Sequence, residues 1–191
     1  ILEEIDRPLV VSIPGSGRYN RRISVRLESN ITAQVHWRLL PDTVFRPYTG
    51  PVELDREGLH TLEYFARAAQ GVESPLKRNE FLVDMTPPRV EVNLKRGVLD
   101  SVSVFLECSE RAIVYYTLDG TSPLFSATTR IAGKGKPQTS YRISVARGPS
   151  MKFAFFAEDG AGNQGALVYY DLTRPRVIPG VAAGTDRVHD R

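Results

Sequence analysis

The residues of this chain that could do chemistry are few and lie far apart in the sequence. Histidine occurs at positions 36, 60 and 189, and Cys108 is the single cysteine, so no His/Cys group has the spacing of a metal site. The chain contains neither the G-x-S-x-G turn of serine hydrolases nor a phosphate-binding glycine loop. We therefore expect a protein that is not an enzyme and that carries no cofactor.

The best candidate for a metal site is the segment "EDGAGN" (158–163), where Glu158, Asp159 and Asn163 offer side-chain oxygens. A calcium ion takes roughly six to eight oxygen ligands, and the spacing here differs from that of an EF-hand loop. We expect Asp159 and Asn163 to hold a tight turn, and calcium binding is the weaker alternative.

A second stretch with possible chemistry is "YYTLDGTSP" (115–123), in which an extended aromatic segment ends at Asp119 and Gly120. An Asp-Gly pair is a strong turn signal and also occurs in ligand loops. The Asp119 carboxylate can cap nearby backbone N–H groups, and Gly120 can adopt a left-handed conformation without a steric penalty. We interpret the stretch as a structural corner of a sheet.

The elements that position these residues occur twice. Three blocks return in the same order: "ISVRLES" (23–29) as "VSVFLEC" (102–108), "EYFARAAQG" (63–71) as "AFFAEDGAG" (154–162), and "FLVDMTPPR" (81–89) as "VYYDLTRPR" (168–176). Self-similarity of this kind indicates one structural module used twice.

Each copy is typical of a β-sandwich, because short segments rich in β-branched and aromatic residues are separated by frequent Gly and Pro. The predicted fold is all-β, with two tandem immunoglobulin-like β-sandwiches joined by a short Pro-containing linker. Module one spans 1–87 with a lead-in over 1–7, and module two spans 88–177 with an insertion near 122–139. Residues 178–191 are expected to be a disordered tail. Pro87 and Pro88 favour extended backbone and leave no flexible linker.

The repeat also predicts which side chains form the two cores. A large aromatic residue at the centre of the third strand suits a sandwich, and Trp37 is expected to hold the place of the immunoglobulin tryptophan. The paired positions assigned to the cores are Val35 and Val114, Trp37 and Tyr116, Leu39 and Leu118, Leu62 and Phe153, Tyr64 and Phe155, Ala66 and Ala157, Phe81 and Val168, and Val83 and Tyr170.

The motifs resemble those of known bacterial modules. "YYTLDGTSP" resembles the YYTxDGSxP signature of the chitobiase/β-hexosaminidase C-terminal-type module, and "FFAEDGAGN" followed by "YYDLTRP" resembles the FxAxDxAGN…DxTPP ending of bacterial Ig-like repeats. The resemblance covers residues from about 8 to 177, although module one has "RLLPDT" and "AAQG" in place of the two turns. It implies a bacterial, exported setting, either periplasmic or at the cell surface.

The residues that alternate with the core set predict an aromatic face. In a sandwich of this type the third, sixth and seventh strands lie side by side, so one outer surface of module two should hold Tyr115, Phe156 and Tyr169. Module one should have a weaker version made of His36, Phe65 and Leu82. A contiguous exposed apolar patch marks an interaction site. Three alternatives remain open: cover by the protein itself, a protein partner, or stacking against a sugar.

The charge of the chain, 25 − 22 = +3, is small and scattered, so we expect no nucleic-acid partner, and no apolar run is long enough to insert into a membrane. We interpret the chain as a non-catalytic spacer, scaffold or docking segment of a larger bacterial envelope or secreted protein. Its partner is expected to be another protein, or a neighbouring domain of the same chain or assembly. The alternatives are a carbohydrate-associated accessory module of a glycoside hydrolase and a calcium-stabilised adhesin-type repeat.

Overall fold

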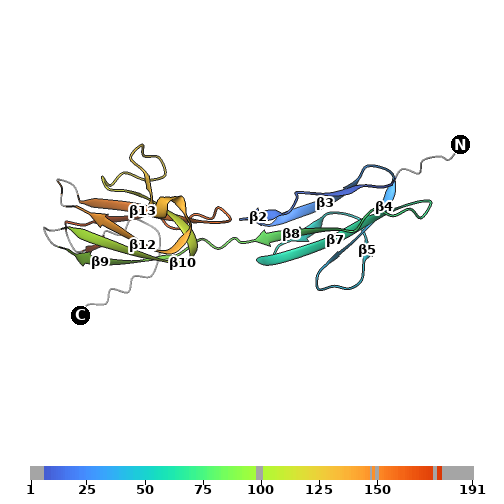
Figure 1. The fold of residues 1–191 in the computed structure, drawn as a ribbon, viewed down its shortest axis with the longest axis horizontal. Helices are drawn as coiled ribbons and strands as arrows, with labels where there is room; N and C mark the ends of the chain where they lie inside the picture. Colours follow the sequence, from blue (N-terminus) through green and yellow to red (C-terminus); the bar gives the residue numbers. More distant parts are fainter. Residues whose placement is uncertain (1–6, 98–100, 147, 149–150, 174–175, 178–191) are drawn as a thin grey trace. The chain divides into compact units, whose positions relative to one another are not determined.

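The computed structural model describes residues 7–97, 101–146, 148, 151–173 and 176–177. The tail predicted over 178–191, His189 and most of the lead-in lie outside these residues. The chain divides into two compact units, Ile1–Met85 and Thr86–Arg191, here called module one and module two. Both are built from strands, and η2 (Ala132–Gly135) is a short 3-10 segment of module two (Figure 1).

Module one consists of two sheets. The three-stranded sheet has the order β1-β3-β6, formed by β1 (Val10–Ile13), β3 (Ile23–Ser29) and β6 (Val52–Leu54). The five-stranded sheet has the order β2-β8-β7-β4-β5, formed by β2 (Gly17–Tyr19), β8 (Lys77–Val83), β7 (Gly58–Ala68), β4 (Ala33–Leu39) and β5 (Arg46–Pro47). The β2–β8 pair is parallel, and the other strand pairs of this module are antiparallel.

Module two repeats this arrangement with two differences. Its strand β10 (Val102–Thr117) passes through both layers, and the outer strand of the larger layer is antiparallel to its neighbour, whereas β2 of module one is parallel to β8. The first half of β10 pairs with β9 (Val90–Arg96) and β12 (Gln138–Val145), and its register shifts between Glu107 and Ala112. Its second half lies between β11 (Arg130–Ile131) and β13 (Lys152–Asp159). The layer continues with β14 (Val168–Asp171) and β15 (Arg176–Val177).

The shared topology shows that the fold is all-β, with two immunoglobulin-like sandwiches in tandem, as the repeat predicts. The third, sixth and seventh strands are β4, β7 and β8 in module one, and the second half of β10, β13 and β14 in module two, and in each module they are neighbours in that order. The range predicted as an insertion holds β11, η2 and the start of β12, so the irregular loop after β10 covers residues 118–129.

Each module has its own hydrophobic core, and the alternation of the strands accounts for it. The predicted core residues that are buried are Val35, Leu62, Tyr64, Ala66, Phe81, Val83, Val114, Phe153, Phe155 and Ala157. The predicted residues that pack against a core while only partly buried are Trp37, Leu39, Tyr116, Leu118, Val168 and Tyr170.

Trp37 packs against the core of module one, as expected, but it is only partly buried and does not take the central position. The fully buried ring at the centre of module one is Tyr64, with 2% of its surface exposed. Trp37 is on β4, close to the edge of the sheet where β5 pairs for only two residues, and the Arg46 guanidinium lies 5.7 Å from its ring. A large indole at such an edge is covered on one side by a cation rather than enclosed by the core.

Cys108 is a free, buried cysteine, as expected from its place on a strand. Burial, followed by the nearby Glu110 carboxylate, raises the pKa of its thiol. A thiol that stays protonated is a poor nucleophile, so this residue acts as a small hydrophobic side chain.

Candidate docking site

The residues of the predicted aromatic face do lie on one side of the five-stranded layers, opposite the cores. Tyr115 on β10 is directly across from Phe156 on β13, and their rings stack with centroids 5.0 Å apart and planes 11° apart. Tyr169 on β14 faces Ala154, which places it diagonal to Phe156. Side chains opposite each other in a sheet, or diagonal to each other, are close enough to interact.

Module one has the corresponding arrangement. His36 on β4 stacks on Phe65 of β7, with ring centroids 5.1 Å apart and planes 13° apart. Leu82 of β8 is opposite Leu59 of β7, so it belongs to the same face at a different level along the strands. The structure therefore brings His36 and Phe65 together and keeps Leu82 separate from them.

Phe156 is almost fully buried, with only 5% of its surface accessible. Tyr115 stacks on the ring, and the loop after β10 is bonded to Thr117, the next residue of β10 on the same face. The Thr117 hydroxyl donates a hydrogen bond to the carbonyl of Thr121 in that loop at 2.6 Å, and both Thr117 and Pro123 are buried. Cover by the protein itself, one of the three alternatives, therefore applies to Phe156.

The loop after the third strand of module one covers the equivalent surface. Phe45 packs edge-on against Phe65 with ring centroids 5.2 Å apart, and the Arg38 guanidinium lies 4.4 Å from the centre of the Phe45 ring. Arg38 also pairs with Glu63 at 2.6 Å and donates to the carbonyl of Thr43 at 2.8 Å. In both modules, the loop that follows the third strand therefore contacts the outer face of the sheet to which that strand belongs.

The loop of module two is held by hydrogen bonds that converge on Asp119. One carboxylate oxygen accepts from the backbone N–H and the hydroxyl of Thr121, at 2.9 and 2.6 Å, and the other accepts from the Thr128 hydroxyl at 2.6 Å. The Ser126 hydroxyl joins the network through Thr121 and Thr128, at 2.8 and 2.7 Å. The bonds from Thr121, then Thr128, lower the pKa of Asp119 from 3.8 to about 2.

Gly120 makes the turn possible. Its φ angle is +80°, and a Cβ atom at this position would lie 2.7 Å from Cδ of Lys152. A left-handed residue with so little space around it has to be glycine. The structural role expected of Asp119 and Gly120 agrees with these contacts.

The network leaves an apolar tip in solvent. Phe125 has 90% of its surface exposed and the adjacent Leu124 has 40%. In module one, Phe45 directly precedes Arg46 of β5, whereas Ser126 to Thr129 separate Phe125 from Arg130 of β11. These four additional residues move the loop phenylalanine away from the sheet and into solvent.

Sequence reasoning missed Phe125, which was treated as part of an insertion. The available signal was the alignment of the two loops, since a phenylalanine follows the third strand in both modules and precedes the next short strand by a different number of residues. Whether this ring is buried depends on the path of the loop, which the strand pattern does not determine.

The turn at Asp159 is built in the same way as the turn at Asp119. Its carboxylate accepts from the backbone N–H groups of Ala161 and Asn163, at 2.7 and 2.9 Å, and from the side-chain amide of Asn163 at 2.8 Å. The Glu158 carboxylate accepts from the side-chain amide of Gln164 at 2.9 Å. The carboxylate of Asp159 is thus engaged in holding the turn, and the nitrogen of the Asn163 amide, rather than its oxygen, faces it.

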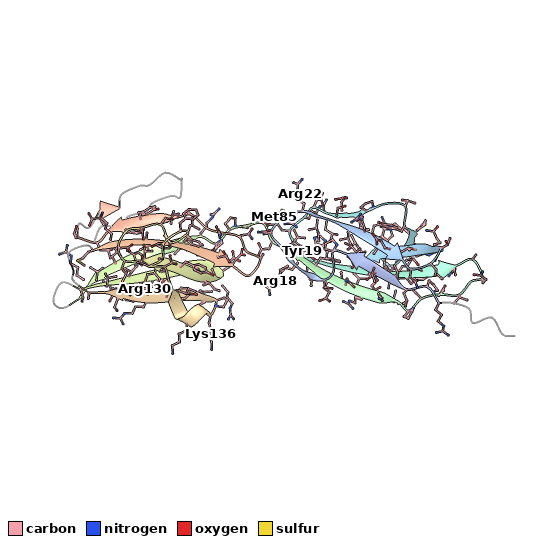
Figure 2. All side chains as sticks on the ribbon, turned by 90° about the horizontal axis from the view of Figure 1, so that it is seen from above. Arg18, Tyr19, Arg22, Met85, Arg130 and Lys136 are labelled. Carbon is pink, nitrogen blue, oxygen red and sulfur yellow. The ribbon has the colours of Figure 1, made fainter. Side chains whose placement is uncertain are left out.

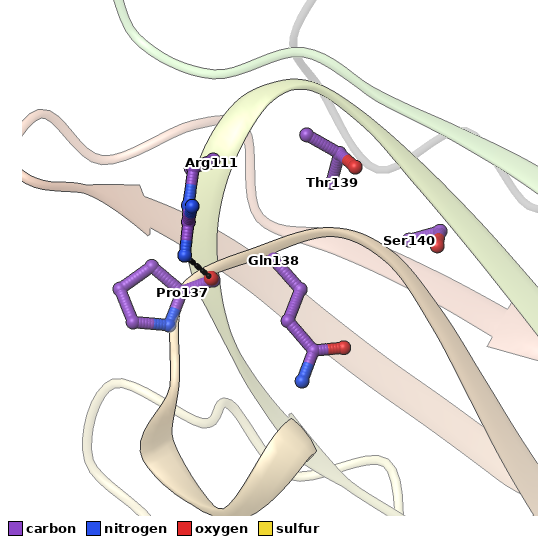
Figure 3. A pocket seen from close by; sticks show the side chains of 5 residues that line it. All are labelled: Arg111, Pro137, Gln138, Thr139 and Ser140. Carbon is purple, nitrogen blue, oxygen red and sulfur yellow. Dashed lines mark hydrogen bonds between the residues drawn. The ribbon is translucent and has the colours of Figure 1, made fainter.

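One surface hollow of module two has a volume of about 470 Å³ and is lined by Arg111 and residues 137–140 (Figure 3). The Arg111 guanidinium donates a hydrogen bond to the carbonyl of Pro137 at 3.2 Å. The guanidinium therefore fixes the chain that leads into β12.

No helix in the described part of the chain has the length and hydropathy needed to span a membrane.

No protein-family model and no curated protein sequence matches the chain. Among solved structures, the chain is similar to the fibronectin(III)-like modules of Clostridium thermocellum CbhA, with 14% identity, 84% of this chain and 91% of that chain covered, and a TM-score of 0.43. It is also similar to a 1.5-MDa bacterial ice-binding adhesin, with 11% identity, 83% of this chain and 62% of that chain covered, and a TM-score of 0.33. A third similar structure is Bacteroides uniformis β-glucuronidase 3, with 13% identity, 87% of this chain and 25% of that chain covered, and a TM-score of 0.28. At these scores the likenesses carry no argument about function.

Proposed function

We propose that the chain is a non-catalytic spacer and docking segment of a larger exported bacterial protein, and that it docks through the apolar tip of the module two loop, Leu124 and Phe125. The partner is a protein that offers an apolar pocket wide enough for one phenylalanine ring. The exported setting rests on the resemblance of the "YYTLDGTSP" and "FFAEDGAGN" motifs to bacterial Ig-like modules.

The observation that supports this function is the 90% exposure of Phe125 on a loop whose backbone is tied down by the Asp119 network. Burying a phenylalanine side chain is worth roughly 1.5–3 kcal/mol, so an exposed ring leaves that free energy available to a complex. A loop that is already ordered loses little conformational entropy on binding. Aromatic residues that fill a partner's pocket are the residues that dominate interface energies.

The aromatic face contributes less to the proposed interface than its three aromatic residues suggest. Phe156 is only 5% exposed and its ring is stacked on that of Tyr115, so it offers a partner almost no surface. Tyr115, Tyr169 and Ile131, which is directly across from Tyr115 on β11, remain partly or largely accessible and can form the rim of an interface centred on the tip.

The proposal is tested by capturing partners from an envelope extract of the source bacterium on the immobilised 191-residue chain. The double variant Leu124→Ser/Phe125→Ser should lose at least about 90% of the captured partner, because one anchor residue can be worth roughly 2 kcal/mol or more. Its melting temperature should stay close to that of the wild type, since surface substitutions change stability by less than about 0.5 kcal/mol.

The matched control is Leu59→Ser in module one, which removes a side chain that is 64% exposed and belongs to neither the tip nor its rim. Capture by this variant should equal that of the wild type. If the tip variant is folded and captures every partner as well as the control does, the docking function is refuted.

A further inference from the structure

Module one exposes a group of arginines beside the three-stranded sheet. Arg21 and Arg22 directly precede β3, and Arg26 lies within it. Residues that alternate along a strand point to one side of a sheet, so Arg22, Ser24 and Arg26 share the face opposite the core. The three guanidiniums are exposed, and none forms an ion pair with a residue that the structure describes.

The positive charge is not evenly scattered along the chain, contrary to the expectation from net charge. Residues 18–26 read "RYNRRISVR", with four arginines and no acidic residue in nine positions. Arg18 is on β2, opposite Leu82, and so belongs to the other sheet. Figure 2 shows Arg18, Tyr19 and Arg22 at one end of module one.

The arginines border a hollow of about 310 Å³. Its lining includes Arg21, Arg22 and Arg26 together with Tyr19, Ile13 and Pro14. Ile13 of β1 is directly opposite Arg26 of β3, which puts an aliphatic side chain next to a guanidinium on the same face. The Tyr19 hydroxyl donates to the carbonyl of Gly15 at 2.5 Å, and this bond fixes the ring.

Two acidic residues share this face: Glu53, which is opposite Ser24, and Glu28, which follows Arg26 by two positions on β3 and is opposite Val11. The Glu53 carboxylate accepts a hydrogen bond from the Ser24 hydroxyl at 2.6 Å, and neither carboxylate forms an ion pair with Arg22 or Arg26 in the described structure. The described residues that line the hollow include three arginines and no acidic residue, so the hollow carries a net positive charge. Such a site attracts anions and recognises planar oxyanions through paired N–H donors.

We propose that this hollow binds an acidic saccharide, with a carboxylate of the sugar held by Arg21, Arg22 and Arg26. The volume is at the lower end of the roughly 300–1,000 Å³ typical of small-ligand sites, which suits one or two sugar units. The ring of Tyr19 and the aliphatic surface of Ile13 and Pro14 offer an apolar wall for the C–H face of a pyranose ring. An extended acidic peptide or a nucleic acid strand would use a longer track of cations than three arginines beside one hollow.

The test uses the 191-residue chain and isothermal titration with three probes: trigalacturonate, the neutral trisaccharide cellotriose, and a hexaglutamate peptide. Trigalacturonate should bind, and its affinity should fall as sodium chloride is raised from about 50 to about 300 mM, because salt screens exposed charges. Cellotriose and hexaglutamate should bind at least about tenfold more weakly, the first for lack of charge and the second for lack of a ring.

The triple variant Arg21→Gln/Arg22→Gln/Arg26→Gln should weaken trigalacturonate binding at least about tenfold, because it removes the charge-assisted hydrogen bonds to the sugar carboxylate. The control Arg130→Gln/Lys134→Gln/Lys136→Gln removes the same charge from exposed residues of module two, two of which Figure 2 labels, and should bind within about twofold of the wild type. The single variant Arg22→Gln provides an intermediate case if the triple variant is poorly folded.

Three outcomes would overturn the proposal. The first is that trigalacturonate produces no heat of binding at any salt concentration. The second is that hexaglutamate binds as tightly as trigalacturonate, which would mark a general anion patch with no preference for a sugar. The third is that the module two control loses as much affinity as the arginine variant, which would mean that net charge and not this hollow determines binding.

Discussion

Phe156 and Phe125 of module two show how differently two phenylalanines behave when one is buried on a sheet and the other lies at the tip of a loop. Phe156 is 5% exposed and Phe125 is 90% exposed. We expect Phe156→Ala to lower the free energy of unfolding by about 3 kcal/mol or more, because removing a buried ring loses its transfer energy and leaves a cavity. Phe125→Ala should change it by less than about 0.5 kcal/mol. Urea unfolding of both variants measures the difference, and equal effects would mean that Phe156 is not buried.

Asp119 gives the second prediction at this scale. Its folded-state pKa, about 2, lies below the ordinary value of 3.8, so the carboxylate stabilises the folded state above about pH 4 and this stabilisation is lost as the pH falls through about 2. The melting temperature of Asp119→Ala should therefore be lower than that of the wild type at pH 7, and the two should converge near pH 2. A gap of constant size across this range would show that the charge of Asp119 does not hold the loop.

At the scale of elements, the loop after β10 should be both exposed and ordered. Isolated module two contains no tryptophan, because Trp37 is the single tryptophan of the chain and belongs to module one, so Phe125→Trp introduces a unique fluorophore there. Acrylamide should quench this indole efficiently while its fluorescence anisotropy decays slowly, at the rate of the whole module. Adding Asp119→Ala should produce a fast component in the decay. A fast component already present with Asp119 intact would contradict the ordered loop.

The strands and their loops also show which features could be predicted from the sequence and which could not. The recurrence of "ISVRLES" as "VSVFLEC" and the alternation around Val114 and Phe155 were enough to predict the strand order, the side of the sheet on which each side chain lies, and most residues of both cores. The burial of Phe156 and the exposure of Phe125 were beyond reach, since both depend on how residues 118–129 fold back. The arginine cluster beside the hollow was missed because the net charge is a sum over the whole chain, and acidic residues elsewhere offset the four arginines of residues 18–26.

At the scale of the whole molecule, each module has a complete core of its own, and no buried residue of one core cluster belongs to the other module. We therefore expect residues 86–177 to fold without module one and to give a cooperative thermal transition with β-type circular dichroism. The reciprocal segment, residues 1–85, serves as the control. A molten or aggregating product from 86–177 would show that module two depends on its neighbour and that the two-module description is incomplete.

The most direct test of docking through the loop tip is site-specific photo-crosslinking in the source organism, with benzoyl-phenylalanine placed at position 125 or at position 59 of the protein. Both positions are exposed, with 90% and 64% of the native side-chain surface accessible, so the probe can reach a neighbour from either one. The account predicts a discrete protein adduct from position 125 that is absent from position 59, and that weakens when Leu124→Ser is added. No adduct from position 125, or the same adduct from both positions, would contradict it.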